Sequence, residues 1–201
     1  MSKPILYIGT KQFSSWSMRP WLCLKHAQID FKEIIIPLRQ ETTKAQINAI
    51  SPSGKVPCLN YNGLLIWDSL AIAEFINELN PQAELLPKNQ EKRAIARAIA
   101  SEMHSGFLDL RKEMPMDTKL KTTQQPSPEV QPNITRILEI WQQTQKKYAD
   151  DGEFLLGKFS IADAFFAPVV SRFISYGIET GEMQKYLETI SNLPIYQEWC
   201  L

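Results

Sequence analysis

The first third of the chain alternates between apolar runs typical of strands and spacings typical of helices. Runs at Ile5–Ile8 and Phe31–Ile36 predict two short strands, the second of which is followed by Pro37. Between them, Ser15–Ala27 has a helical pattern of apolar positions. The segment is therefore expected to form a β–α–β unit.

A second group of elements follows, in which the spacing of apolar residues again alternates between helical and strand-like. A polar helical stretch near Thr42–Ile50 leads to two apolar runs, Val56–Leu59 and Leu64–Trp67, which flank Tyr61-Asn62-Gly63 as an antiparallel hairpin. A helix is then predicted by apolar residues at i, i+3, i+4 and i+7, which are Ile72, Phe75, Ile76 and Leu79. Pro81 ends this helix. The order through residue 80 is βαβαββα, a mixed sheet with helices on its faces.

After Pro81 the strand signals vanish and long helical stripes take over. The two main stripes are Ile95, Ile99, Met103, Phe107 and Leu110, and then Ile134, Ile137, Leu138 and Trp141. We expect an N-terminal domain over 1–80, a linker over 81–87 and an all-helical domain over 88–201. Four prolines within 115–132 indicate a surface connection between helices.

Charge and composition narrow the function classes. Lys plus Arg and Asp plus Glu both number 22, so the formal net charge is zero and nucleic acid is not an expected partner. No apolar run approaches the ~20 residues of a membrane span, and the N-terminus lacks the features of a signal peptide, so we expect a cytoplasmic protein without a membrane partner. Three scattered cysteines and two histidines predict buried reduced thiols and no metal site.

Three short segments carry candidate chemistry, each with a structural alternative. The serines of FSSWSMRP (13–20) either cap the helix that follows or hold the activated atom of a ligand. At Val56-Pro57 the proline is either an ordinary edge-strand residue or forms a cis bond that turns the Val56 backbone outward, toward a peptide-like ligand. Asp68-Ser69 either caps the next helix or binds an α-amino-acid head group, with its ammonium on Asp68. In contrast, Ser160 and Asp163 form the pattern of a purely structural capping box.

These motifs, in this order and spacing, resemble the cytosolic glutathione transferase family over essentially the whole chain. The resemblance rests on SPSGKVPCL, on DSLAIAEFI thirteen residues after Lys55, and on SIADAFFAPVVSRF in the helical half. The opening FSSWSMRPWLCLKHA looks like serine-type members, close to the zeta and theta classes and bacterial relatives. The resemblance implies an α/β thioredoxin-like N-terminal domain (βαβαββα), an all-α C-terminal domain and a homodimer.

The resemblance also implies a site for glutathione, which acts as a co-substrate with no further cofactor. A hydroxyl at the positive end of a helix favours the thiolate of glutathione, which is the nucleophile. Ser14 lies five residues before Arg19 and is the preferred donor, with Ser15 as the close alternative. Asp68 and Ser69 are expected at the γ-glutamyl head, and the resemblance adds Lys55 at the glycine end and Val56 through its backbone.

The electrophile is expected to contact the first long helix of the second domain. Met103 and Phe107 share a face of that helix in this interpretation, although both also continue the apolar stripe and can be core residues. His104 points elsewhere and is the better pocket candidate, with a surface or core histidine as its alternative.

Three functions are compatible with this sequence. The leading one is a glutathione transferase that acts on small electrophiles. The second is a glutathione-dependent isomerase of the maleylacetoacetate isomerase type, or a dehalogenase. The third is a non-catalytic binding protein with the same fold.

Overall fold

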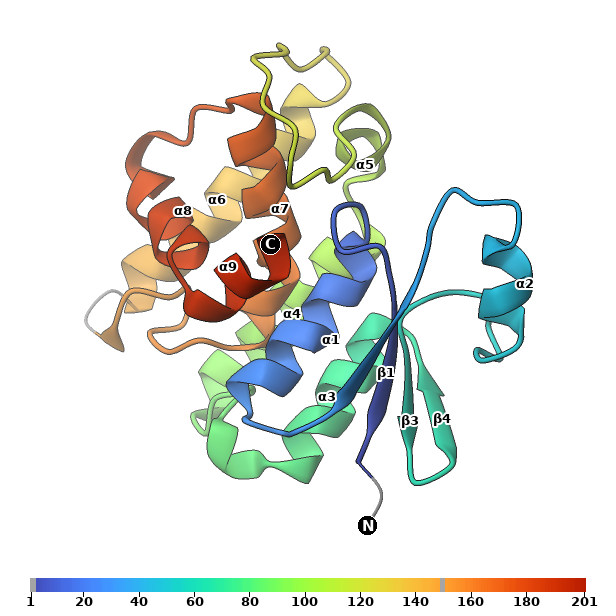
Figure 1. Cartoon of the computed structure of the whole chain (residues 1–201). Helices are drawn as coiled ribbons and strands as arrows, with labels where there is room; N and C mark the ends of the chain where they lie inside the picture. The colour runs from blue at the N-terminus through green and yellow to red at the C-terminus, as the bar shows by residue number, and fades with distance from the viewer. Residues whose placement is uncertain (1–2, 149–150) are drawn as a thin grey trace. The chain divides into compact units, whose positions relative to one another are not determined.

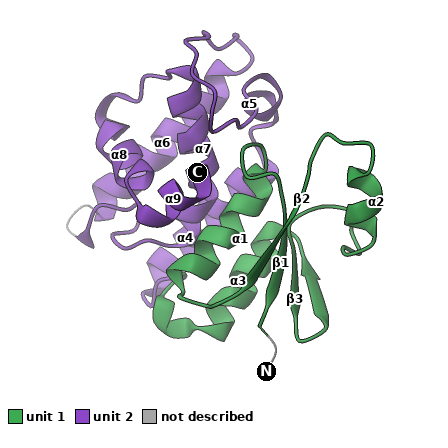
Figure 2. Cartoon of the chain, in the orientation of Figure 1, with its two compact units in different colours: residues 1–85 green, residues 86–201 purple. Residues whose placement is uncertain are grey.

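The computed structural model describes residues 3–148 and 151–201. Two compact units divide the chain, residues 1–85 and 86–201 (Figure 2). Unit 1 contains, in order, β1 (Ile5–Gly9), α1 (Ser15–His26), β2 (Lys32–Ile36), α2 (Thr43–Asn48), β3 (Cys58–Tyr61), β4 (Leu64–Trp67), α3 (Ser69–Leu79) and a 3-10 turn (Pro81–Ala83). The predicted thioredoxin-like order βαβαββα is confirmed.

The sheet of unit 1 has the strand order β2-β1-β3-β4. β2 pairs parallel to β1, and β3 pairs antiparallel to both β1 and β4, so β4 runs in the same direction as β1. Figure 1 shows α1 and α3 together on one face of this sheet and α2 on the other side. The core of the unit contains fully buried apolar side chains from β1, α1 and α3, each worth roughly 1.5–3 kcal/mol of hydrophobic stabilisation: Leu6, Ile8, Trp21, Ile72 and Ile76.

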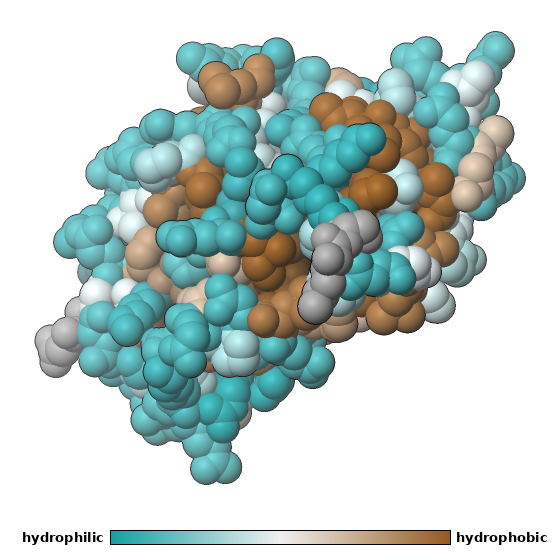
Figure 3. Space-filling view, turned by 60° about the horizontal axis from the view of Figure 1, so that its bottom comes forward, coloured by the Kyte–Doolittle hydropathy of each residue, from teal (hydrophilic) through white to brown (hydrophobic). Residues whose placement is uncertain are grey.

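The hairpin between β3 and β4 follows from the turn residues of its sequence. Asn62 and Gly63 both have positive φ angles, 52° and 89°, as a two-residue hairpin turn requires. Asn60 fixes the turn further, because its Oδ1 accepts the backbone N–H of Gly63 at 2.9 Å. β4 is an edge strand on which Leu64 and Trp67 are exposed. More generally, Figure 3 shows one face of the molecule on which apolar side chains interrupt the hydrophilic surface.

Unit 2 is helical, as predicted. Its helices are α4 (Gln90–Ser105), α5 (Leu108–Glu113), α6 (Gln131–Tyr148), α7 (Ile161–Tyr176), α8 (Gln184–Ser191) and α9 (Pro194–Cys200), with a 3-10 turn at Gly181–Met183. α7 is buried along nearly its whole length and packs against α4. The aromatic core surrounds Trp141, whose ring centroid lies 4.9 Å from Tyr186, 5.4 Å from Phe173 and 5.7 Å from Phe166.

The prediction of one helix through SEMHSGFLDLR is wrong, because α4 ends at Ser105 and α5 begins at Leu108. Phe107 adopts the left-handed conformation (φ 60°) in the break, so it does not share a helical face with Met103. A downstream residue binds the end of α4: the Arg111 guanidinium donates to the carbonyls of Gly106 and Met103 and thereby satisfies them. A Cβ at Gly106 would lie 2.9 Å from the Glu102 carbonyl oxygen, so glycine suits this position.

The predicted capping box at the start of α7 is confirmed. Asp163 is fully buried, and its carboxylate accepts the Ser160 N–H at 2.9 Å and the Ser160 hydroxyl at 2.9 Å. It also accepts the Leu155 N–H at 3.2 Å and the Tyr186 hydroxyl at 3.1 Å. This carboxylate therefore joins the start of α7 to α8 and to the segment that precedes it.

Candidate functional site

The strand register of unit 1 brings the three candidate segments to one edge of the sheet. β1 and β4 run in the same direction, so α1 and α3, which follow them, begin at the same edge. Cys58, the first residue of β3, pairs with Tyr7 in the middle of β1 and with Trp67 at the end of β4. Val56-Pro57 therefore lies between the two helix N-termini that carry Ser14 and Ser69.

At the first of these N-termini, Ser14 occupies the N-cap position of α1 but its side chain makes no capping hydrogen bond. Its hydroxyl donates instead to Ser17 Oγ at 2.7 Å. Ser15 is the first residue of the helix, and the two side chains are each 5% exposed. The helical capping interpretation of the serine pair is therefore wrong for the Ser14 side chain, and its hydroxyl is available to turn toward a ligand.

The loop before Ser14 is held from several directions. Thr10 Oγ1 accepts the Leu38 N–H at 2.9 Å, and the Arg39 guanidinium lies 3.9 Å from the centroid of the Phe13 ring. A Cβ at Gly9 would lie 2.7 Å from Leu38 Cδ1, so a larger residue there would require the Leu38 side chain to move. Sequence reasoning did not identify the Leu38–Arg39 segment as part of this region.

Two residues of α1 behind the serines carry positive charge and aromatic surface. Arg19 is fully buried, and its guanidinium lies 4.3 Å from the centroid of the Trp16 ring, a distance typical of a cation–π contact. Trp16 itself is 36% exposed. Trp16 therefore presents an exposed aromatic surface at the start of α1, and its ring is in contact with the Arg19 guanidinium.

The Val56-Pro57 peptide bond is cis. Pro57 precedes β3, which is an inner strand of the sheet, so the edge-strand interpretation of this proline is wrong. Lys55 is exposed and Val56 is half-buried. Next to them, burial raises the pKa of the Cys58 thiol, which donates to the Ile50 carbonyl at 3.4 Å, so this cysteine is not a thiolate at neutral pH.

The second N-terminus, that of α3, has one residue with a strained backbone and one with a hydroxyl that makes no hydrogen bond. Asp68 has φ 73° and ψ 130°, a conformation that is uncommon for residues other than glycine, and its Oδ1 accepts the Leu70 N–H at 2.8 Å. The following residue, Ser69, is 1% exposed, and its Oγ has no hydrogen-bond partner among the residues that the structure describes. Buried hydroxyls are normally paired, so the Ser69 hydroxyl is suited to a group from outside the chain.

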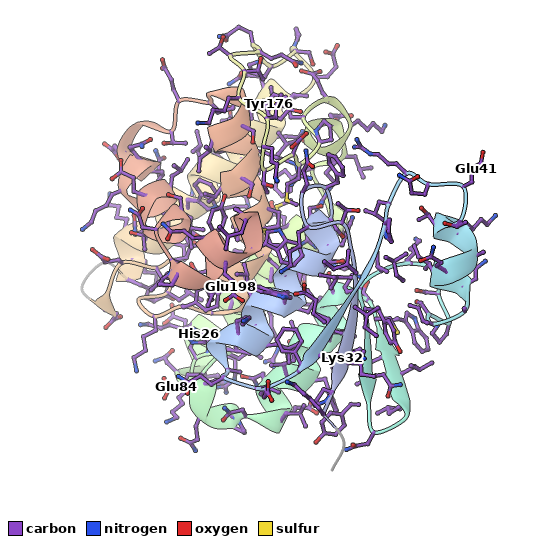
Figure 4. The ribbon with its side chains drawn as sticks, in the orientation of Figure 1. His26, Lys32, Glu41, Glu84, Tyr176 and Glu198 are labelled. Carbon is purple, nitrogen blue, oxygen red and sulfur yellow. The ribbon has the colours of Figure 1, made fainter. Side chains whose placement is uncertain are left out.

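Of the histidines, His26 lies at the other end of α1 from Ser14 (Figure 4). Burial lowers the pKa of His26, so it is neutral at pH 7. In unit 2, Met103 is fully buried, and the His104 ring lies 6.2 Å from that of Phe165. A contact of Met103, His104 or Phe107 with an electrophile stays a prediction.

Comparisons with known proteins identify the family of the chain. The family model described as the glutathione S-transferase N-terminal domain matches residues 13–79. The maleylacetoacetate isomerase of Rattus norvegicus is 30% identical over 177 residues, which are 84% of this chain and 77% of the rat protein. The chain belongs to the glutathione S-transferase family.

Another relative and a solved structure match the chain over different lengths. A relative from Caenorhabditis elegans is 39% identical over 108 residues, but these span only 54% of this transferase-family chain and 50% of the nematode protein. The crystal structure of a glutathione transferase homologue from Burkholderia, with bound glutathione, has a TM-score of 0.74 and 23% identity, and the match covers 98% of this chain and 96% of that one. The likeness in structure shows the fold that the sequence predicted.

Metal-ligand clusters and membrane-spanning helices were each considered for the described residues, 3–148 and 151–201, of this transferase-family chain. These residues contain no group of three or more His, Cys, Asp or Glu side chains arranged to hold a metal ion. None of their helices is by itself long and apolar enough to cross a membrane; α7 and Gly181–Ser191 pass that test only as a pair, bent by 113°.

Proposed function

We propose that this chain is a glutathione transferase whose unit 1 binds glutathione along the sheet edge where α1 and α3 begin. The observation that carries the proposal is the buried, unpartnered hydroxyl of Ser69 beside the strained Asp68. Strain and an unsatisfied buried group are costly, and a site that binds an amino-acid head group accounts for both. The Burkholderia homologue with the same fold, whose structure contains glutathione, supports this ligand.

Each part of glutathione has a complementary group in this arrangement. The α-carboxylate of its γ-glutamyl residue suits the Ser69 hydroxyl and the N–H groups that open α3, and the ammonium suits the Asp68 carboxylate. The Val56 backbone, beside the cis bond, pairs with the cysteinyl residue in strand-like fashion. Lys55 is exposed and suits the glycine carboxylate.

Glutathione supplies a thiol that is reactive as its thiolate. An unperturbed thiol has a pKa near about 8.5, so only a few per cent is ionised at neutral pH. The Ser14 hydroxyl, at the N-terminus of α1, donates to the sulfur, and both the hydrogen bond and the helix dipole favour the charged form. Ser14 acts here as a donor only, since a serine nucleophile needs a paired base.

A second candidate reaction is a glutathione-dependent cis–trans isomerisation. The specific observation in its favour is that the relatives from rat and mouse, 30% and 31% identical, are named maleylacetoacetate isomerase. Reversible attack by a thiolate on a conjugated double bond allows rotation about that bond and needs the same activated sulfur. The two reactions therefore share the site in unit 1 and differ in the second substrate.

The first test is a pair of matched substitutions in the serine pair. We expect Ser14→Ala to lower kcat about 10- to 100-fold with little change in the Kd for glutathione, because one charge-assisted hydrogen bond is lost. Ser15→Ala is the control and is expected to keep most of the activity. Loss of activity in Ser15→Ala alone would move the role of donor to Ser15.

The second test identifies the reaction. Retention on glutathione-agarose separates both catalytic candidates from a non-catalytic protein that does not bind glutathione. Assays with a chlorinated aromatic electrophile, a peroxide and maleylacetone then compare conjugation, reduction and isomerisation in one preparation. Binding without turnover of any of these substrates counts against both reactions.

We also propose that the chain forms a homodimer, as the family resemblance implies. Because the net charge is zero, two copies of the chain do not repel each other strongly. The edge strand β4 also exposes the apolar side chains of Leu64 and Trp67. Sedimentation is expected to give a mass near twice 23.1 kDa at micromolar concentration. A species of 23.1 kDa would contradict the proposal.

A further inference from the structure

Ser17 lies one helical turn after Ser14 and is completely buried. Residues three apart share a face of a helix, which explains why the two hydroxyls meet. Ser17 Oγ accepts two hydrogen bonds, from the Ser14 hydroxyl at 2.7 Å and from the Gly9 N–H at 3.2 Å. The residue thus connects the last residue of β1 with the N-cap of α1.

The hydrogen-bonding capacity of Ser17 is only partly used. A hydroxyl has two lone pairs and one proton. Both lone pairs of Ser17 Oγ are occupied, while no acceptor for its proton exists among the described residues. At 0% exposure, water does not reach this hydroxyl from the surface. Ser17 therefore has an unused donor, and the hydroxyl oxygen of Ser14 lies 2.7 Å from its own oxygen.

We propose that Ser17 is a positioning residue for Ser14, and that the two hydroxyls reverse their hydrogen bond when the thiolate of glutathione is bound. The proposal rests on the function proposed above. The Ser14 proton turns from Ser17 to the sulfur, and the Ser17 proton turns to Ser14 Oγ. Two O–H groups rotate and no covalent bond breaks. The result is a chain of donors in one direction: Gly9 N–H to Ser17, Ser17 to Ser14, and Ser14 to the sulfur.

Such a chain favours the thiolate more than Ser14 does alone. Hydrogen bonds in series polarise one another, so a Ser14 hydroxyl that accepts from Ser17 is a stronger donor to the sulfur. The start of the chain is fixed, because Gly9 pairs with Ile36 in the sheet and packs against Leu38. The chain also lies at the N-terminus of α1, where the helix dipole favours negative charge.

A purely structural role, in which Ser17 only ties β1 to α1, makes a different prediction. Removal of a structural tie lowers stability and leaves the ionisation of bound glutathione unchanged. Removal of a donor in the chain raises the pKa of the bound thiol. This pKa is measurable without turnover, from the ultraviolet absorbance of the thiolate in the complex as a function of pH.

The decisive variant is Ser17→Ala. We expect a higher pKa for the bound thiol and a kcat/KM about 3- to 10-fold lower at pH values below that pKa, the equivalent of one hydrogen bond. The difference should disappear at high pH, where the thiol is ionised in both proteins, and the Kd for S-methylglutathione should not change. Ser17→Thr keeps the hydroxyl and should restore the wild-type pKa.

The matched control is Ser171→Ala in unit 2. Ser171 is 2% exposed and forms a hydroxyl–hydroxyl contact of 2.8 Å with Tyr196, so its removal reproduces the loss of a buried hydroxyl away from the serine pair. We expect a lower melting temperature and an unchanged thiol pKa. If Ser17→Ala does not fold, Ser17→Cys, with a weak donor in the same place, should shift the thiol pKa in the same direction.

A double-mutant cycle separates this inference from the proposed function. If Ser17 acts through Ser14, the bound thiol should have the same pKa in Ser14→Ala and in Ser14→Ala/Ser17→Ala. An unchanged thiol pKa in Ser17→Ala, or equal and additive shifts in the cycle, overturns the role of Ser17 while leaving that of Ser14 intact. A wild-type complex without thiolate absorbance overturns the proposed function itself. An unchanged pKa in Ser14→Ala moves the donor away from Ser14 and overturns the role of Ser17 with it.

Discussion

The two units treat their buried polar groups differently. In unit 2, Asp163 accepts four hydrogen bonds, and the guanidinium of Arg172 donates to the carbonyls of Met114 at 2.9 Å and Pro168 at 3.1 Å. In unit 1, the Ser69 hydroxyl has no partner in the described structure, and the proton of Ser17 has no acceptor there. Saturated groups serve the fold, whereas the unused capacity lies at the sheet edge where we propose that glutathione binds.

Two groups in unit 2 depart from this contrast, because neither has a hydrogen-bond partner among the described residues. One is the buried hydroxyl of Ser127, and the other is the buried indole N–H of Trp141. Aromatic rings surround it, however, with the Tyr186 centroid at 4.9 Å and an interplanar angle of 63°. Ring faces accept N–H donors weakly. An unpaired buried group is therefore not by itself the mark of a ligand site; at Ser69 the strained backbone of Asp68 is a second observation.

The largest expected effect tests the structural side of the comparison. Asp163→Ala should lower the free energy of unfolding by about 3 kcal/mol at pH 7, because the donors of Leu155, Ser160 and Tyr186 lose a buried acceptor. Urea denaturation measures this, and calorimetry on the folded variant should give the wild-type Kd for glutathione. A large change in that Kd would mean that Asp163 is not purely structural.

The same carboxylate predicts a pH dependence of stability. Burial raises the pKa of Asp163 from 3.8 to about 6, so the folded state holds this proton more tightly than the unfolded state does. The resulting stability is present in full below pH 3.8 and is lost as the pH rises through about 6. The loss amounts to about 3 kcal/mol. Unfolding free energies from pH 4 to 7.5, measured as the difference from Asp163→Asn, check this; a difference that does not vary with pH contradicts it.

The sequence predicted unit 1 better than the middle of unit 2, for a physical reason. Local signals decide the elements of unit 1: the period changes at Ser69, the turn needs Asn62-Gly63, and each strand ends at or just before a glycine, a proline or a polar residue. The break between α4 and α5 depends on Arg111, whose guanidinium binds the end of the preceding helix. The apolar spacing continues through Gly106 undisturbed, so only the glycine itself signalled the break.

The candidate site shows the same limit. Ser14, Asp68 and Ser69 were predicted from their place at helix starts, which is a local property. The role of Ser17 was not, because its importance comes from Gly9 in a neighbouring strand. The spacing of Ser14 and Ser17 by three residues was the available signal, and it becomes meaningful only when the strand end is known to lie beside it.

A smaller effect is expected from Asp68→Asn, which tests the ligand side of the comparison. Asparagine caps helices as well as aspartate does and tolerates a positive φ, so stability should hardly change. The charge that we assign to the ammonium of glutathione is lost, and the Kd should rise roughly 10- to 100-fold. Calorimetry with glutathione and with its analogue lacking the ammonium group provides the check. Equal Kd values for glutathione in both proteins would remove Asp68 from the site.

The smallest effect is expected from the pair Ser69→Ala and Ser160→Ala, two serines at helix starts that differ in their partners. Ser160 donates to Asp163 at 2.9 Å, so its removal should cost about 1 kcal/mol of stability and leave the Kd for glutathione unchanged. Ser69 has no partner in the described structure, so its removal should cost no stability and raise that Kd about 2- to 10-fold, the loss of one hydrogen bond. Melting temperatures should therefore fall only in Ser160→Ala, and calorimetric Kd values for glutathione should rise only in Ser69→Ala. A Ser69→Ala variant that melts earlier but binds glutathione like the wild type would show that its hydroxyl serves the fold, and that an unpaired buried hydroxyl at this sheet edge does not mark the ligand.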